Sequence, residues 1–448
     1  MSDSQSDGAD VFEAGKHSSE GQSDVSRSGL GGEHRPISRR RFIQAGGGVL
    51  VGLAMASRGF AVNTAPKKIR IGVVGGGFGT SFQWHEHPDC IVEAVSDLRP
   101  ERRKLLMEVY RCAKSYDSLE ELVKDPRIEA VAIFTEGPNH VKHAIEAFKR
   151  GKHVISAVPA CMGGGIEEAE RLLDAVKKSG LTYMMAETSY YHQIAISARK
   201  FHEARKFGEI YYAEAEYQHA GLEALYFENG KRTWRHGVAP MHYPTHCTAF
   251  LIGVTGERLA EVTCHGWGDN DPICKDNVYH NPFWNESAMF RTNRGHAFRV
   301  NVWWKGAHRG VERAQWIGSK MSLYAATSNG AAPVLVRAGG QKETDDAGFV
   351  RDLPEFETYQ QPQWWKTDML PEPLRHDSGH DGSHTFLTHE FIDALTHNRR
   401  PAVDIHEALA YTVPGIVAHE SALKGGERLK IPTFYIGVEH AATGEQIG

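Results

Sequence analysis

A glycine-rich segment follows the first strongly apolar run of the folded part of the chain and contains Gly75-Gly76-Gly77-Phe78-Gly79-Thr80. Gly75 permits a tight turn, Gly77 lets backbone amides approach a pyrophosphate, and a helix expected after the glycines would present its positive N-terminus to the phosphates. Asp97 ends the next apolar run about 20 residues further on, where an acid accepts hydrogen bonds from ribose hydroxyls and repels a 2′-phosphate. This order predicts an NAD-type site, and the alternative is a structural turn with a solvated Asp97.

Two neighbouring residues bear on the cofactor. Thr80 stands at the third glycine position of the fingerprint, so the helix and the strand are expected to lie slightly further apart. Arg99 is close to Asp97 in the sequence, which leaves the use of NADP open beside that of NAD.

The elements that position these residues alternate between short apolar runs and amphipathic stretches. The runs are rich in β-branched residues, as buried parallel strands are, and cover 69–74, 91–96, 130–134, 153–158 and 182–186. Amphipathic stretches such as 140–150 and 167–178 lie between them. The alternation predicts a doubly wound α/β Rossmann domain over residues 67–190.

A second domain is expected over residues 191–432. A helix at 195–207 precedes alternating segments typical of antiparallel strands with one packed face, at 210–217, 288–292, 297–304 and 311–317. Residues 326–383 are rich in Gly, Asp, Pro and Gln and are expected to form long loops. Helices at 383–397 and 405–423 close an α+β domain, and 433–448 is a C-terminal tail.

The N-terminal residues indicate export. Residues 1–37 are too polar to bury a core and are expected to be disordered. Ser38-Arg39-Arg40-Arg41-Phe42, a weakly apolar run at 43–56 and the small-x-small end Ala54-Met55-Ala56 indicate a twin-arginine signal and linker over 38–66. The alternative, a membrane anchor, is disfavoured because the run holds four glycines and ends before Arg58. The expected location is the periplasm.

Length and composition narrow the function. A chain of 448 residues exceeds one typical core, so two domains sharing a cleft are expected. The net charge of -5 and the absence of a basic block after the leader argue against nucleic acid as a partner. The six cysteines form no C-x-x-C pair, which argues against a zinc knuckle or a thioredoxin-type motif, and a chain of this size needs no disulfide.

Further along, Thr135-Glu136-Gly137-Pro138-Asn139-His140 and Gly151-Lys152-His153-Val154 resemble the nucleotide domain of the Gfo/Idh/MocA oxidoreductase family, and the resemblance extends over about 67–432. It implies a Rossmann domain, a second domain with an open, mainly antiparallel sheet, NAD or NADP, sugar or cyclitol substrates, and homo-oligomers formed through the open sheet. The cofactor contacts expected on this basis are Gly75, Gly77, Phe78, Thr80, Asp97, Thr135, Asn139, His140 and Val158.

The chain departs from the family where a catalytic Lys usually stands in Glu-Lys-Pro, because it has Ala157-Val158-Pro159. In this it is similar to exported NAD-dependent glycosidases of the α-N-acetylgalactosaminidase type, which have Glu-Val-Pro there. Tyr243-Pro244-Thr245-His246 matches the Tyr-Pro-Thr-His of that subgroup. The subgroup's tyrosine, Tyr-x-His and Trp-Arg elements correspond to Tyr191, Tyr217, His219 and Trp234-Arg235. Ala157 replaces the subgroup's Glu, and the segment between Arg235 and Tyr243 is shorter here.

Oxidation of a carbinol carbon requires a base for the hydroxyl proton, and histidine is the natural candidate once the lysine is gone. We therefore expect His246 to transfer the proton, with Tyr191 or Tyr243 as its partner. The substrate contacts expected are Tyr217, His219, Arg235, Thr245, His380 and His384.

The spacing of several histidines raises a metal site as an alternative. His242 and His246 are four apart, as are His376, His380 and His384. Pro244 breaks the helix that would align the first pair, and no carboxylate completes an H-E-x-x-H motif. Residues 379–384 therefore fit a glycine-rich substrate loop better, and no metal is predicted.

Three classes of function agree with these features. The first is a net sugar dehydrogenase, the second a redox-neutral glycosidase that recycles its NAD in place, and the third a nucleotide-holding binding protein without turnover. An exported enzyme has no free nicotinamide pool, which favours a tightly bound cofactor recycled in place, through glycoside cleavage or through transfer between two sugars. The expected partners are a small sugar or glycoside and the twin-arginine export machinery.

Overall fold

The computed structural model describes residues 68–434 except 220, 270, 307–309 and 327–329, all within one compact unit. The expected disordered segment 1–37, the signal segment 38–66 and all but two residues of the tail 433–448 lie outside the described residues. Among the helices of the described part, none is long and apolar enough to cross a bilayer.

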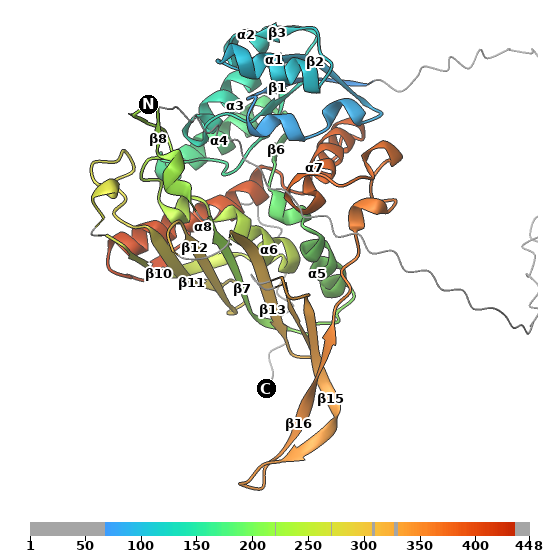
Figure 1. Cartoon of the computed structure of the whole chain (residues 1–448), viewed down its shortest axis with the longest axis vertical. Coiled ribbons are helices and arrows are strands. Elements are labelled where there is room, and N and C mark those ends of the chain that lie inside the picture. The colour runs from blue at the N-terminus through green and yellow to red at the C-terminus, as the bar shows by residue number, and fades with distance from the viewer. Residues whose placement is uncertain (1–67, 220, 270, 307–309, 327–329, 435–448) are drawn as a thin grey trace, which may run out of the picture. The chain divides into compact units, whose positions relative to one another are not determined.

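The first sheet has six parallel strands in the order β3-β2-β1-β4-β5-β6 (Figure 1). Its strands are β1 (Ile69–Val74), β2 (Cys90–Ser96), β3 (Ser115–Tyr116), β4 (Ala130–Ile133), β5 (His153–Ser156) and β6 (Tyr183–Met185). The connecting helices are α1 (Pro100–Val109), α2 (Leu119–Leu122), α3 (His140–Lys149) and α4 (Gly165–Ser179). The strand order reverses between β1 and β4, and sheets of this kind bind ligands beyond the carboxyl ends of the strands at that point. The predicted doubly wound domain is confirmed.

The chain differs from the prediction directly after the glycines. No α-helix follows β1; two 3-10 turns, Phe78–Ser81 and Trp84–Glu86, take its place. Gln83 between them is left-handed, with φ of 51°, which a continuous helix cannot contain. Phe82 and Trp84 are fully buried, so packing of the two aromatic rings sets the path of this segment.

The second sheet has nine strands in the order β16-β15-β14-β13-β7-β12-β11-β10-β17. Its strands are β7 (Ile210–Gln218), β10 (Leu259–Trp267), β11 (Asn285–Thr292), β12 (Ala297–Trp303), β13 (Val311–Gly318), β14 (Met321–Tyr324), β15 (Val334–Thr344), β16 (Val350–Thr358) and β17 (Leu429–Lys430). The pair of β7 with β12 is parallel, and all other pairs are antiparallel. The expected mainly antiparallel sheet is confirmed, although two of its predicted strands pair in parallel.

Three helices accompany this sheet: α5 (Gln193–Glu203), α6 (Thr245–Thr255) and α8 (Ile405–Leu423). The helix α7 (Gly379–Thr396) instead packs its apolar side chains with those of β1 in the first domain. The helix α8 begins where the Asp404 side chain accepts the backbone N–H groups of His406 and Glu407. One hydrophobic cluster runs from Val131 in β4 through Leu409 in α8 to Val300 in β12. The two sheets therefore share a core, which fixes the nucleotide edge of the first sheet relative to the second.

The prediction of long loops over 326–383 is wrong in part. Strands β15 and β16 form a hairpin that projects from the end of the sheet (Figure 1). At its tip the Asp345 carboxylate accepts the backbone N–H groups of Ala347 and Phe349. Phe349 and Phe356 are 72% and 73% exposed, so the hairpin lacks the buried face whose alternating pattern identifies a strand in sequence.

Candidate functional site

The glycine loop after β1 has the backbone that a dinucleotide site requires. Gly75 has φ of 103°, and a Cβ there would lie 2.2 Å from the carbonyl oxygen of Phe134. A Cβ on Gly77 would meet only Arg102 Nη1, at 3.7 Å. The turn at Gly75 thus needs glycine, and the backbone at Gly77 faces space into which a pyrophosphate could approach.

Asp97 joins this loop to the carboxyl end of β2. Its Oδ2 accepts the backbone N–H of Gly76 at 2.6 Å, and its Oδ1 accepts that of Arg99 at 2.8 Å. Each carboxylate oxygen can accept a second hydrogen bond, so the acid is held in place and can still receive ribose hydroxyls. The Thr80 hydroxyl donates to the carbonyl of Gly77 at 2.9 Å and tightens the same turn. These residues fit NAD.

The other expected cofactor residues lie at the carboxyl ends of β4 and β5. The ring nitrogens of His140 lie 3.0 Å from the carbonyl oxygen of Thr135 and 2.8 Å from that of Pro159. His140 is 1% exposed, so it clamps the two loops together and does not face the cleft. Asn139 closes the turn after β4 through its backbone N–H, and Val158 packs at the edge of the core.

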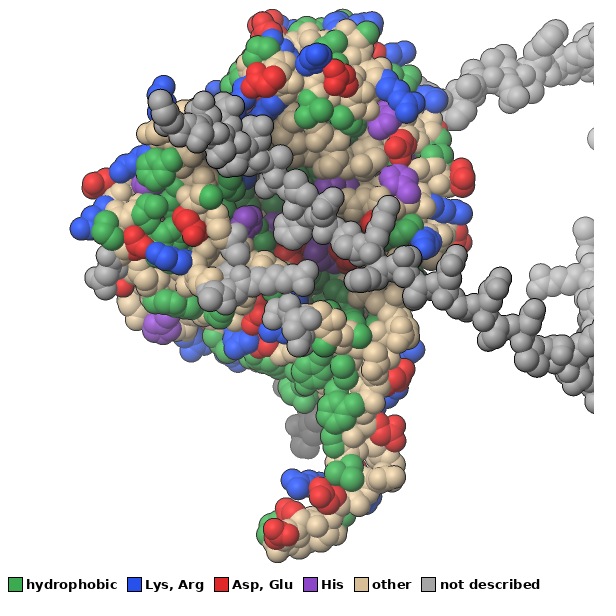
Figure 2. All heavy atoms as spheres, in the orientation of Figure 1, with side chains coloured by type: hydrophobic (Ala, Val, Ile, Leu, Met, Phe, Trp, Pro, Cys, Tyr) green, Lys and Arg blue, Asp and Glu red, His purple; other side chains and the backbone are tan. Residues whose placement is uncertain are grey.

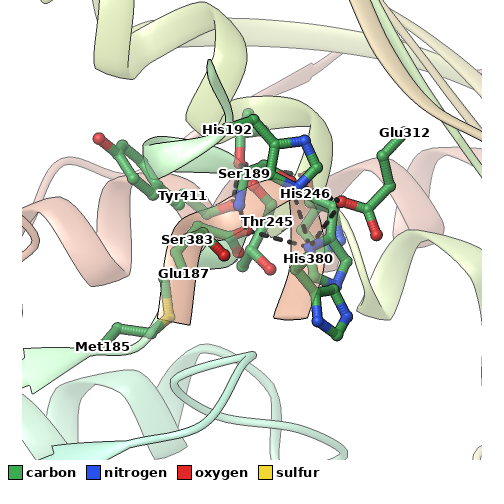
Figure 3. A network of polar contacts seen from close by, with 12 residues as sticks. Met185, Glu187, Ser189, His192, Thr245, His246, Glu312, His380, Ser383 and Tyr411 are labelled. Carbon is green, nitrogen blue, oxygen red and sulfur yellow. Dashed lines mark hydrogen bonds and ion pairs between the residues drawn. The ribbon is translucent and has the colours of Figure 1, made fainter. Parts of the chain in front are cut away.

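A buried cluster of charged side chains stands beyond β6, around the first turn of α6 (Figure 3). His246 Nδ1 lies 3.0 Å from Glu187 Oε1 and 3.9 Å from Glu312 Oε2. The Ser189 hydroxyl donates to Glu312 Oε2 at 3.0 Å, and His192 Nε2 lies 3.3 Å from the same oxygen. Because Glu187 holds Nδ1, the opposite nitrogen of His246 is the one available to a substrate.

The electrostatics of the cluster keep His246 protonated. Burial lowers the pKa of His246, but the carboxylates of Glu187 and Glu312 raise it to about 9. Burial raises the pKa of Glu312, but His246, His192 and His380 lower it to about 2. Burial likewise raises the pKa of Glu187, and His246 with the Thr245 hydroxyl lowers it below its usual range. At neutral pH the site therefore holds an imidazolium between two carboxylates. Thr245 itself is fully buried behind Glu187.

His380 connects this cluster with the nucleotide loop. Its ring centroid lies 5.4 Å from that of Phe78, and Glu312 is the carboxylate that most strongly opposes the lowering of its pKa by burial. His380 and Asp381 are left-handed, with φ of 50° and 55°, a conformation that side-chain-bearing residues rarely adopt. The Asp381 carboxylate accepts the backbone N–H of Gln193 at 2.9 Å and holds this strained start of α7. Burial lowers the pKa of His380, so at neutral pH this histidine is neutral whereas His246 is charged.

His384 lies behind His380 and is 1% exposed. Its ring stacks on Phe82 at 4.4 Å, its Nδ1 lies 3.0 Å from the carbonyl oxygen of Ser81, and its Nε2 lies 2.9 Å from His380 Nδ1. The structure thus places His384 as a support for His380. His376 points elsewhere and pairs with Glu86 at 2.6 Å. In the described part of the chain no three His, Cys, Asp or Glu side chains form a metal-binding group.

An aromatic wall borders the cluster. The ring of Tyr217 lies 4.5 Å from that of His246, and the ring of Tyr243 stacks parallel to it at 6.2 Å. His219 contacts Tyr217 at 6.0 Å between ring centroids. Burial raises the pKa of both tyrosines, and the Arg235 guanidinium partly opposes this. The two phenols are therefore neutral hydrogen-bonding groups next to the imidazolium. Figure 2 shows histidine side chains in the hollow between the two parts of the molecule.

The structure does not bring Tyr191 to His246. Its ring stacks on Phe386 at 5.4 Å with an angle of 2°, on the side of α7. Among the described residues, no hydrogen bond or ring contact joins Tyr191 to His246. The residue two positions earlier, Ser189, reaches the cluster instead, with its hydroxyl oxygen 3.4 Å from His246 Nδ1.

Sequence reasoning missed both carboxylates of the cluster. Glu187 lies two residues after the end of β6, and the carboxyl end of a parallel strand is a position where a functional side chain is expected, so this signal was present. Glu312 is the second residue of β13 and enters the site because β13 pairs with β7, where Glu312 lies opposite Tyr217. No local pattern marks it.

Comparison with known proteins supports the architecture. Residues 69–187 match the oxidoreductase family with an NAD-binding Rossmann fold. The chain is similar to a glycosyl hydrolase family 109 protein of Solibacter usitatus, with 24% identity over 344 residues, which cover 71% of this chain and 74% of that protein. It is also similar to the alpha-N-acetylgalactosaminidase of Bacteroides fragilis, with 30% identity over 139 residues, which cover 29% of this chain and 32% of that protein.

Solved structures share the fold across both domains. Levoglucosan dehydrogenase in complex with NADH and L-sorbose superposes with a TM-score of 0.64 at 18% identity, covering 82% of this chain and 100% of that one. Together with the family match, this confirms an NAD-binding Rossmann domain joined to a second, mainly antiparallel sheet.

Proposed function

We propose, from a nucleotide domain that belongs to the Gfo/Idh/MocA oxidoreductase family, that this protein is an NAD-dependent oxidoreductase acting on a CH–OH group of a sugar or glycoside. The observation that carries the proposal is the buried Glu187–His246 pair, which His380 links to Phe78 of the nucleotide loop. The glycine loop and Asp97 would hold the nucleotide, which supplies reversible redox chemistry at a carbinol carbon when bound.

The two histidines suit opposite proton-transfer roles. His246 is positively charged below a pKa of about 9 and can donate a proton or a strong hydrogen bond to a substrate oxygen. Burial lowers the pKa of His380, which leaves it neutral and able to accept a proton. Two titratable groups whose surroundings move their pKa values apart form an acid and a base. Tyr217, Tyr243 and Arg235 would orient the hydroxyl groups of the sugar, since aromatic rings with polar ends combine packing with hydrogen bonding.

Net cleavage of a glycoside without net oxidation is the second candidate, and the coexistence of an acid and a base favours it. A neutral His380 can take the proton from the carbon next to an oxidised one, while a charged His246 protonates the departing glycosidic oxygen. The similarity to a glycosyl hydrolase family 109 protein and to an alpha-N-acetylgalactosaminidase supports this route.

Export and self-association complete the proposal. Residues 38–66, which lie outside the described residues, support export to the periplasm by the twin-arginine machinery. A protein exported in this way would carry its cofactor with it and recycle it. Exposed Trp267 and Met289, in the adjacent strands β10 and β11, support assembly of copies through the open sheet.

The test is anaerobic mixing of the purified protein with a panel of sugars and glycosides, followed by absorbance of bound NADH and by release of the aglycone. Appearance of NADH with an oxidised sugar supports the dehydrogenase. Release of the aglycone without accumulation of NADH, with a deuterium label at the oxidised carbon retained in the product, supports redox-neutral cleavage. A protein that binds nucleotide but gives neither signal with any sugar would contradict both enzymatic candidates.

A further inference from the structure

A short segment of the second domain reaches the nucleotide domain at the end of β2. It contains the hairpin of β8 (Phe227–Glu228) and β9 (Lys231–Arg232). Arg99 Nη1 donates to Glu228 Oε1 at 2.7 Å, and Arg99 Nη2 donates to Glu228 Oε2 at 2.5 Å. This is a two-pronged guanidinium–carboxylate pair, the arrangement in which arginine binds carboxylates and phosphates most specifically.

The segment, residues 227–234, also contacts the nucleotide domain at the end of β4. A Cβ on Gly137 would lie 3.3 Å from the indole ring of Trp234. A cavity of about 430 Å³ lies between the segment and the nucleotide domain. It is lined by Glu136 of the nucleotide domain and by Glu228, Lys231 and Trp234 of the segment. Because β1 lies between β2 and β4 in the sheet, the segment passes the carboxyl end of β1, where the glycine loop begins.

Arg99 is the cation nearest in sequence to the acid expected to bind the adenosine ribose. Its own backbone N–H donates to Asp97 Oδ1 at 2.8 Å. An arginine beside this position usually donates hydrogen bonds to the 2′-phosphate of NADP. Here Glu228 accepts one N–H from each terminal nitrogen and offsets the charge of the guanidinium. An incoming phosphate would therefore meet an arginine that is already paired, with two carboxylates nearby, those of Glu228 and Asp97.

We propose that Glu228 is a specificity residue, supplied by the second domain, that makes this protein select NAD over NADP by occupying Arg99. The inference rests on the nucleotide-binding part of the proposed function and is independent of the substrate. The side chains of Arg99 and Glu228 are 43% and 50% exposed. Exposed pairs contribute little to stability, so a variant without this pair should fold.

The experiment measures binding of NAD and of NADP to the full-length protein freed of nucleotide, by calorimetry at constant ionic strength. In Glu228→Gln the affinity for NADP relative to NAD should rise about tenfold or more, because the freed guanidinium gains a charge-assisted bond to the phosphate. Glu223→Gln is the matched control, since it removes an exposed carboxylate from the preceding turn and should leave the ratio unchanged. In the double variant Arg99→Ala with Glu228→Gln the gain should disappear.

An unchanged ratio in Glu228→Gln would overturn this inference alone. An equal gain in Glu223→Gln, or a gain that survives in the double variant, would also overturn it, because the effect would then be one of net charge. A wild-type protein that binds neither nucleotide would overturn the nucleotide assignment itself, which separates the two failures.

Discussion

Among the described residues, two glutamate–histidine pairs have both side chains less than 10% exposed, and their surroundings differ. Glu187 and His246 are 3.0 Å apart, with side chains 0% and 8% exposed. Glu286 and His419 are 2.7 Å apart, with side chains 0% and 6% exposed. Burial and pairing alone therefore do not distinguish a reactive histidine from a structural one.

The partners of each pair make the distinction. The second oxygen of Glu286 accepts the backbone N–H of Met241 at 2.7 Å, so this carboxylate ties β11 to the turn before α6 and to His419 on α8. His246 instead has a second carboxylate, Glu312, and the aromatic wall beside it. Glu187 also accepts a backbone N–H, that of Ser189 at 2.9 Å, so a backbone bond is common to both pairs. The reactive pair differs in its second carboxylate, which gives it surplus negative charge, and in bordering groups that can bind a ligand.

The largest expected difference between the pairs concerns turnover. His246→Gln should lower turnover by on the order of 10²- to 10⁴-fold, the usual contribution of a general acid or base, with folding and nucleotide content intact. His419→Gln, the same substitution in the structural pair, should change turnover at low temperature by only a few-fold. Steady-state rates on the substrate identified by the panel would measure both. Unchanged turnover in His246→Gln would move the proton transfer to His380 or Tyr217.

For stability we expect the opposite result: substitutions in the Glu286–His419 pair should cost more than substitutions around His246. Glu286→Ala leaves His419 buried without its partner and the Met241 amide without its acceptor, so the free energy of unfolding should fall by about 3–5 kcal/mol. Glu312→Gln should cost much less, because Glu187 still pairs with His246. Denaturant titration of both variants measures this, and equal losses would mean that the two clusters are structurally equivalent.

The fold could be predicted best where the order of apolar and polar residues indicates which side chains are buried. The strands β1, β2, β4 and β5 are buried on both faces and appear as apolar runs, so the sheet and the glycine loop at its edge followed from the sequence. His246 followed from a family motif. The β15–β16 hairpin was not predicted, because both of its faces are largely exposed.

The candidate site itself depends on strand pairing between segments that are distant in the sequence, and no local sequence pattern indicates which strands pair. Ser189 and Glu312 are 123 positions apart and meet only because the second sheet places β13 beside β7. Glu312 is one of the two carboxylates that raise the pKa of His246. Tyr191 shows that closeness in the sequence does not place a side chain at the site. A short 3-10 turn, Thr188–Tyr191, directs Ser189 to the cluster and Tyr191 to Phe386.

The smallest expected effect is a shift in pH dependence. The pKa of His246 in the folded protein is about 9, above the ordinary 6.5, so its protonation stabilises the fold fully below about pH 6.5, and this contribution is lost as pH rises toward 9. A reaction step that needs the charged His246 should likewise slow above pH 9. In Glu312→Gln one of the two carboxylates that raise this pKa is gone, so the midpoint should fall by about 1 to 3 pH units.

Titration of labelled histidines by NMR, together with the basic limb of the rate profile, would detect the shift. Glu286→Gln is the matched control, because it removes a carboxylate that is not among the groups acting on His246 and should leave the midpoint in place. A midpoint that stays near 9 in Glu312→Gln would mean that Glu187 alone holds the charge on His246. The two pairs would then differ only in whether the histidine borders the aromatic wall.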